Sequence, residues 1–193
     1  MGKGRLEAFS DGVIAILITI MVLELKVPHG EQWQALQPLW PVFLSYVLSF
    51  VNVGIYWNNH HHLLHACRQV TGPMLWANLH LLFWLSLVPW ATGWMGENHF
   101  AALPVALYGG VLLMAAVAYT VLQQLIIASQ GPDSLLRRAV GADWKAKASL
   151  AAYVAAVPLA FVWPVAAMGL YVAVALTWLV PDRRIERQLG HAE

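Results

Sequence analysis

The stretch from Arg5 to Lys26 constrains this chain more than any other, because it is apolar almost throughout. A helix rises about 1.5 Å per residue, so a helix over residues 6–26 is about 30 Å long. That length matches the hydrocarbon thickness of a lipid bilayer. The few charged residues of the stretch lie toward its two ends. We therefore predict that it crosses a membrane as a helix.

Composition extends this prediction to the whole chain. Of the 193 residues, 60% are hydrophobic and 11% are charged, whereas a soluble domain has about 25% charged residues. We predict an all-α integral membrane protein whose surroundings are the lipid bilayer. The net charge of +1 says nothing about nucleic acid, but there is no basic block of the kind that binds it, so we predict no nucleic-acid partner. The single cysteine, Cys67, excludes an intrachain disulfide and a multi-cysteine metal site.

Six apolar segments are predicted to be the spans of one domain covering residues 1–193. They are residues 6–26, 39–66, 74–94, 100–129, 147–163 and 164–181. The last two belong to one apolar run that is interrupted by Trp163-Pro164. This run gives roughly 50 Å of helix, which is too long for one crossing and short for two. Basic residues flank both of its ends, so we predict a tight hairpin of two short helices.

The distribution of basic residues predicts the orientation. With six spans and both termini cytosolic, one face receives Lys3, Arg5, Arg68, Arg137, Arg138, Lys145, Lys147, Arg183, Arg184 and Arg187. The other face receives only Lys26. Cytoplasmic loops of membrane proteins carry an excess of Lys and Arg, and five or seven spans would remove this asymmetry.

The first predicted helix carries an apolar stripe. At about 100° per residue, five residues point the same way, with Thr19 on their flank: Phe9, Gly12, Ile16, Ile20 and Leu23. Asp11 points nearly opposite. The stripe alone favours contact with lipid, but it is also compatible with copies of the helix that face one another around a pore.

Several polar residues are predicted to share one depth near the cytosolic side. They are Arg5, Ser10 and Asp11 in the first helix, His60 and His61 in the second, and Asn78 in the third. A buried carboxylate is costly unless it is paired and hydrogen-bonded. We therefore predict one structural network that fixes the first helix to its own subunit, so that loss of the Asp11 charge abolishes the folded oligomer. The alternative is that Asp11 binds an ion or relays protons.

The histidine run of the second helix suggests a metal site, because His61 and His65 are four residues apart and share a helix face. No carboxylate or thiol accompanies them except Cys67, and adjacent histidines diverge around a helix. We therefore predict no metal, no haem or other cofactor, and no enzymatic activity.

The first helix resembles a family signature. Arg5-x-x-x-Phe9-Ser10-Asp11, with Gly12 to Ile16 and Thr19 after it, is similar to the opening motif of the transmembrane protein 175 family of potassium channels. Two later motifs also resemble the family: Trp57-x-x-His60-His61 and Leu75-Trp76-x-Asn78-Leu79. Length and segment number fit the single-repeat prokaryotic form, which implies a cell membrane location.

The resemblance implies a homotetramer whose first helices line a central pore. It implies the pore constriction at Ile16, continued by Ile20 and Leu23, with Thr19 as a threonine layer. It also implies that Arg5 and the Phe9-Ser10-Asp11 group are structural.

These residues suggest how potassium would be preferred, since no filter sequence of the TVGYG type occurs. Stacked aliphatic rings exclude water, and potassium loses its hydration water more easily than sodium does. A Thr19 hydroxyl ring could partly replace that water, and Glu24 near the outer end could concentrate cations at the mouth. We predict a potassium-preferring cation channel; the alternative is a proton channel or proton-coupled transporter that uses Asp11 and the His60-His61 region.

Overall fold

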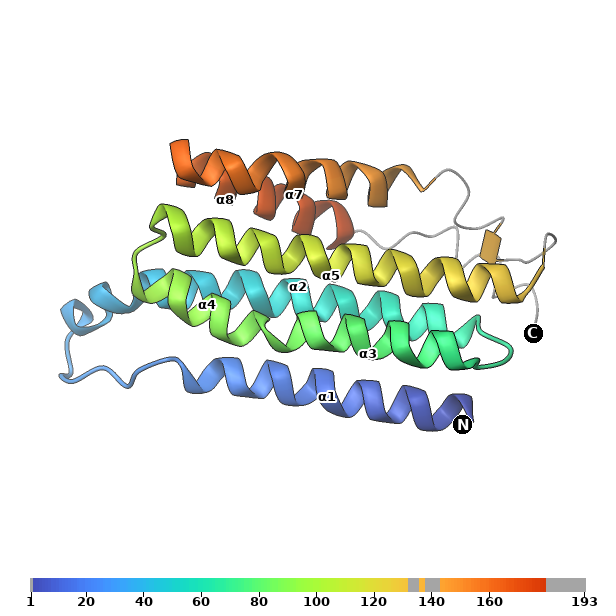
Figure 1. Cartoon of the computed structure of the whole chain (residues 1–193). Coiled ribbons are helices and arrows are strands. Elements are labelled where there is room, and N and C mark those ends of the chain that lie inside the picture. The colour runs from blue at the N-terminus through green and yellow to red at the C-terminus, as the bar shows by residue number, and fades with distance from the viewer. Residues whose placement is uncertain (1, 132–135, 138–142, 180–193) are drawn as a thin grey trace.

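The computed structural model describes residues 2–131, 136–137 and 143–179, and over these ranges it is a bundle of helices (Figure 1). In chain order the elements are α1 (Lys3–Leu23), the 3-10 helix η1 (Trp33–Leu39), α2 (Trp40–His65), α3 (Gly72–Ser86), α4 (Val88–Glu97), α5 (Ala102–Ser129), α7 (Trp144–Val162) and α8 (Pro164–Leu179).

Five helical segments of the described chain are long and apolar enough to cross a bilayer. They are Lys3–Leu23, Trp33–His65, Gly72–Glu97, Ala102–Ser129 and Trp144–Val162. The sixth, α8, is apolar but shorter, with 16 described residues. Residues 180–181 of the last predicted span lie outside the described residues.

Prolines account for two breaks in these helices. Pro89 has no backbone N–H to continue the ladder, and α3 ends at Ser86, just before α4 starts at Val88. Pro164 opens α8 directly after Trp163, whose φ of −148° and ψ of 81° are not helical. The second break lets α8 pack back against α7 as a hairpin (Figure 1).

The connection between α1 and α2 differs from the sequence-based expectation. Residues 27–38 read as a loop, because they contain Pro, Gly and polar side chains. The structure instead forms η1 over Trp33–Leu39, and η1 runs directly into α2. A short 3-10 helix leaves little sequence periodicity, so local composition does not reveal it.

The arrangement of the helices leaves α1 at one edge of the bundle. Figure 1 shows α1 on one side and the α7–α8 hairpin on the opposite side. Between them α5 packs against α3, α4, α7 and α8, while α1 packs against α2, α3 and α4. One long face of α1 is therefore not covered by its own subunit.

Candidate pore-lining helix and its buried contacts

The covered face of α1 is a single row of side chains. Its buried members are Leu6, Ser10, Ile14, Leu17 and Met21, at helical spacing. Four of these are apolar and join the hydrophobic core of the bundle. The polar exception, Ser10, is completely buried and marks one point where α1 is hydrogen-bonded to the rest of the subunit.

The uncovered face of α1 carries the apolar stripe. Ile16 is 57% exposed, Ile20 41% and Leu23 79%, although all three are large aliphatic side chains. Phe9 is half exposed and belongs to the same face. The Thr19 hydroxyl donates to the carbonyl of Ile16 at 2.9 Å, so its oxygen lone pairs remain available on the exposed side.

A buried hydrogen-bond chain links α1, α3 and α2. The Asn78 Nδ2 donates to Ser10 Oγ at 2.9 Å, and the Ser10 hydroxyl donates to the Leu6 carbonyl at 2.8 Å. On its other side Asn78 Oδ1 lies 2.7 Å from His60 Nε2. Because Asn78 Oδ1 can only accept, His60 Nε2 carries a proton. Ser10, Asn78 and His60 are all fully buried.

Asp11 and His61 lie outside this hydrogen-bond chain and contact other residues. Trp57 Nε1 donates to Asp11 Oδ1 at 3.1 Å. His61 Nδ1 lies 3.2 Å from Glu7 Oε1, at a partly exposed site. Sequence reasoning did not include Trp57 or Glu7 in the network. The signal was available, because Glu7 and Asp11 are four residues apart on one helix face, as are Trp57 and His61 on another.

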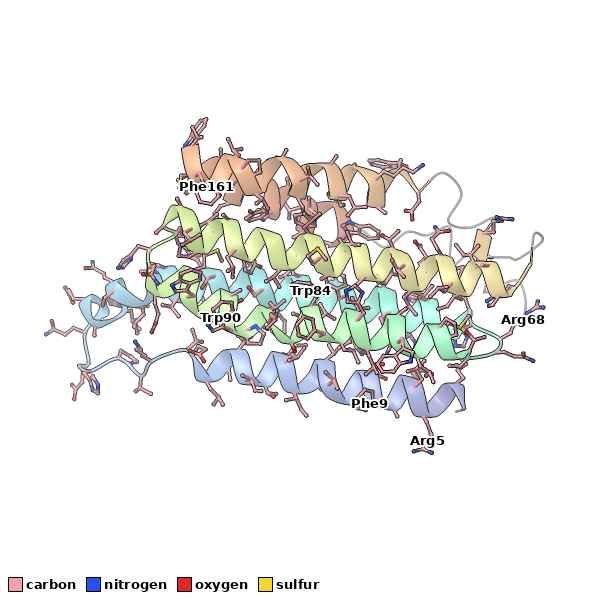
Figure 2. All side chains as sticks on the ribbon, in the orientation of Figure 1. Arg5, Phe9, Arg68, Trp84, Trp90 and Phe161 are labelled. Carbon is pink, nitrogen blue, oxygen red and sulfur yellow. The ribbon has the colours of Figure 1, made fainter. Side chains whose placement is uncertain are left out.

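Arg5 and Phe9 also lie apart from the buried chain, unlike the predicted network. Arg5 is exposed, and Figure 2 shows its side chain pointing away from the bundle. Five residues separate Arg5 from Ser10, which places the two side chains about 140° apart around a helix. Equal depth in the membrane therefore does not bring Arg5 to Asn78.

At the C-terminal end of α1, charged side chains meet α4. Lys26 Nζ lies 2.7 Å from Glu97 Oε1, and this hydrogen bond raises the Lys26 pKa. Glu24 is exposed, and its Oε2 lies 3.3 Å from the position that a Cβ would take at Gly93. The glycine thus lets the Glu24 carboxylate lie close to the α4 backbone.

The histidine run does not gather further ligands. The rings of His61 and His65 stack with centroids 6.3 Å apart. Within the described ranges, no three His, Cys, Asp or Glu side chains are grouped as a metal would require.

Comparison with known proteins identifies the family. The family described as endosomal/lysosomal potassium channel TMEM175 matches residues 5–89. A Chryseobacterium protein named as a potassium channel is 57% identical over 189 residues, which are 98% of each chain. The chain belongs to the TMEM175 family. The expectation drawn from the first-helix motif is thereby confirmed.

Two further TMEM175 proteins place this chain within the family. The crystal structure described as a lysosomal potassium-selective channel TMEM175 homolog from Chamaesiphon minutus is 25% identical, with a TM-score of 0.74. The match covers 93% of this chain and 97% of that one, which confirms the predicted all-α membrane fold class. The Gallus gallus protein named endosomal/lysosomal proton channel TMEM175 is 35% identical over 103 residues, only 21% of its length.

Proposed function

We propose that this chain forms a potassium-preferring cation channel whose pore is lined by the uncovered face of α1. One observation carries the proposal: three large aliphatic side chains, Ile16, Ile20 and Leu23, stand exposed on a helix whose opposite face is fixed by buried contacts. The names of the Chryseobacterium and Chamaesiphon relatives support potassium as the permeant ion.

The pore requires several copies of the chain. A single subunit offers one stripe at the edge of its bundle, and one stripe cannot enclose a path for ions (Figure 1). In the proposed homotetramer, four stripes face a central axis and the rest of each bundle lies outside them. The number four rests on the resemblance to the family.

In this tetramer the aliphatic side chains would form stacked rings with the tightest at Ile16. A narrow apolar ring penalises a hydrated ion, and it penalises sodium more than potassium because sodium holds its water more strongly. The Thr19 hydroxyls would offer oxygen ligands between the rings, and Glu24 would lie at the outer mouth.

With α1 lining the pore, the polar residues on its opposite face have a structural role. Ser10, Asn78 and His60 fix α1 against its own subunit, and Trp57–Asp11 and Glu7–His61 support it nearer the surface. The excess of basic residues on one side favours cytoplasmic termini in a prokaryotic cell membrane. Neither a cofactor nor a catalytic role is part of the proposal.

Potassium and sodium flux into liposomes tests the pore assignment. Purified wild type is compared with Ile16→Asn and with Val154→Asn, which makes the same replacement at a residue of α7 that is 59% exposed on the far side of the bundle. We expect Ile16→Asn to reduce the preference for potassium over sodium, and Val154→Asn to leave it unchanged. Equal selectivity in all three proteins would remove α1 from the pore.

A second candidate function is proton conduction. The vertebrate relatives are named proton channels, and Asp11 is an ionisable residue on α1 that is only partly buried. The same liposomes loaded with a pH-sensitive dye distinguish the two functions. Potassium flux without acidification supports the first; acidification that depends on Asp11 supports the second.

A further inference from the structure

A second polar stripe runs along α2, on a side that the pore does not use. Its members are Ser45, Ser49, Asn52, Tyr56 and Asn59, with spacings of four, three, four and three residues. These spacings place all five on one helix face. Ser45 and Ser49 are completely buried, and Asn52 is 4% exposed. Polar side chains inside a membrane bundle require partners, so this stripe needs an explanation.

The outer part of the stripe is satisfied by other side chains. Thr92 of α4 donates to Ser49 Oγ at 2.6 Å, and Ser49 in turn donates to the Tyr108 hydroxyl of α5 at 3.0 Å. These bonds join three helices in the core of the bundle. No solvent is needed to complete this part of the stripe.

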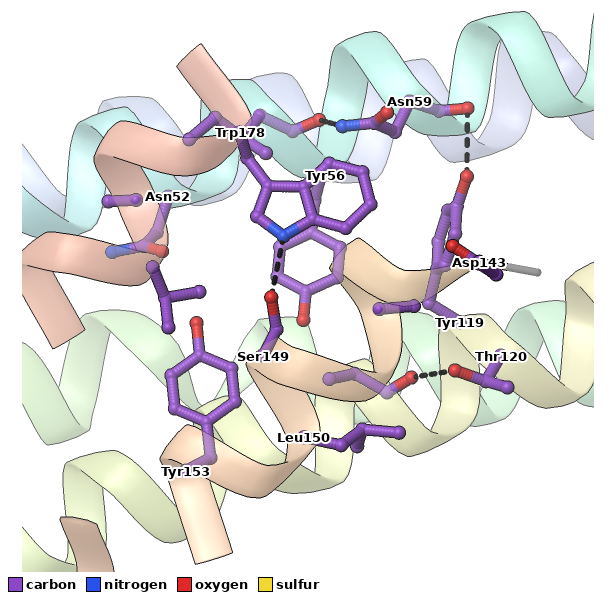
Figure 3. Close-up of a pocket in the computed structure, with 15 residues that line it drawn as sticks. Asn52, Tyr56, Asn59, Tyr119, Thr120, Asp143, Ser149, Leu150, Tyr153 and Trp178 are labelled. Atoms are coloured by element: carbon purple, nitrogen blue, oxygen red, sulfur yellow. Dashed lines mark hydrogen bonds between the residues drawn. The ribbon is translucent and has the colours of Figure 1, made fainter. Parts of the chain in front are cut away.

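The inner part of the stripe borders a cavity between α2, α5, α7 and α8 (Figure 3). The cavity has a volume of ≈ 60 Å³ and is partly open. Its polar lining includes Asn52 and Asn59 from α2, Ser149 and Tyr153 from α7, and Trp178 from α8. A water molecule requires about 10 to 15 Å³ of such volume, so there is room for about four.

One polar group in this cavity lacks a protein partner. Tyr153 is 3% exposed, and Figure 3 shows its hydroxyl pointing into the cavity. No hydrogen bond joins this hydroxyl to another residue in the described part of the chain, and the cavity that it borders is partly open. By contrast the neighbouring Tyr171 hydroxyl donates to the Val105 carbonyl at 3.2 Å. A bound water would supply the hydrogen-bond partner that this hydroxyl lacks.

We propose that this cavity, which Asp143 also lines, is a binding site for small hydroxylic molecules, occupied by a water cluster that the Tyr153 hydroxyl and the Asn52 carboxamide hold. The site lies within one subunit and is separate from the proposed pore, because α1 and the α7–α8 hairpin lie on opposite sides of the bundle (Figure 1). Water in this position links α7 and α8 to α2 where direct side-chain packing is incomplete.

Hydroxyl-radical footprinting tests the proposal on the assembled full-length protein in lipid nanodiscs. Short X-ray pulses convert water into radicals that oxidise the nearest side chains, and mass spectrometry reports the rate for each tyrosine. Tyr171 is the matched control, since it is fully buried and its ring centroid lies 6.0 Å from that of Tyr153. We expect Tyr153 to be oxidised several-fold faster than Tyr171.

A cavity-filling variant locates the water. Ala175 lines the cavity and is 3% exposed, so Ala175→Leu fills part of the space, while Ala175→Ser leaves it open. We expect only Ala175→Leu to slow the oxidation of Tyr153. Equal oxidation rates for Tyr153 and Tyr171 in the wild type would overturn the proposal. A lipid acyl chain that fills the cavity would give this result. An Ala175→Leu protein that folds but shows an unchanged rate of Tyr153 oxidation would overturn the proposal as well. If this variant does not fold, the comparison of Tyr153 with Tyr171 in the wild type decides.

Discussion

Asn78 is the residue on which the position of α1 depends most. Its carboxamide uses one end for Ser10 and the other for His60, so a single side chain connects α3 to both α1 and α2. Replacing it with an apolar residue of similar size leaves the buried His60 ring without a partner and removes the hydrogen bond that Ser10 Oγ accepts, while Ser10 keeps its bond to the Leu6 carbonyl.

We expect Asn78→Leu to destabilise the folded protein by about 2 kcal/mol. Asn98→Leu, at an exposed asparagine at the end of α4, is the matched control and should have little effect. The measurement is the temperature at which the proposed oligomer is lost in size-exclusion chromatography. Similar temperatures for both variants would show that the buried bonds contribute little.

Asp11 permits a charge-specific prediction. The sequence-based hypothesis placed Asp11 in the buried network and expected loss of the folded oligomer when its charge is removed. In the structure Asp11 accepts a hydrogen bond from Trp57, and an asparagine oxygen can accept the same bond. We therefore expect Asp11→Asn to retain the oligomer and its potassium flux.

Size-exclusion chromatography followed by the liposome flux assay checks this outcome. Asp11→Leu, which cannot accept the bond, serves as the comparison and should lower the yield of oligomer. An Asp11→Asn protein that assembles normally but loses acidification would favour the proton function instead.

The sequence predicted the depth of these polar side chains in the membrane, but it did not predict in which direction around the helix each of them points. The basic residues and the ends of the apolar runs placed Ser10, His60 and Asn78 at one level, and these three are hydrogen-bonded to one another. The partners of Asp11 and His61 depend on how α1 and α2 are rotated against each other. That rotation results from packing along the whole helices, so local spacing does not determine it.

Among the elements, the contact between α5 and α8 depends on one glycine. A Cβ added at Gly109 would collide with the Tyr171 hydroxyl, whereas a Cβ at the adjacent Gly110 would meet nothing within 4 Å. The two glycines therefore form a matched pair for testing how closely α8 packs on α5.

We expect Gly109→Ala to destabilise the protein by about 1 to 3 kcal/mol, because overpacking forces the helices apart. Gly110→Ala should be neutral or stabilise by up to about 1 kcal/mol, since alanine favours helix. Thermal unfolding of the two variants checks the prediction. If the two variants unfold at the same temperature, the inference that α8 packs closely on Gly109 is wrong.

The sequence also indicated most helix boundaries, because single residues at known positions determine where these helices break. Proline removes a backbone donor at a known position, so the breaks near Pro89 and at Pro164 could be anticipated. The 3-10 helix η1 could not, because it has no buried residues and leaves no periodic pattern in the sequence.

For the whole molecule, the proposed tetramer makes a prediction about crosslinking. Cys67 is the single cysteine of the chain, so a Cys67→Ser background is free of thiols. In that background Ile16→Cys should form disulfide-linked dimers under mild oxidation, since four copies would approach one another at the constriction. Larger products should not appear, because each cysteine can form one bond.

Non-reducing gel electrophoresis of the oxidised protein in membranes is the measurement. Val154→Cys, on the opposite side of the bundle, should remain monomeric on the same gel. Crosslinking at Val154 but not at Ile16 would place the interface on α7 rather than on α1.

The attachment of α1 also determines how it can move. Mechanically it is a rod clamped near its N-terminal end, where Ser10 is bonded to Asn78. Toward its C-terminal end it is held by the non-directional apolar contacts of Leu17 and Met21 and by an exposed Lys26–Glu97 pair that salt screens. Leu23 lies about 20 Å along the rod from Ser10, so a tilt of about 5° moves it by about 2 Å. Displacement is smallest near the clamp and grows outward. In the proposed pore, dilation at Leu23 therefore requires less deformation than dilation at Ile16.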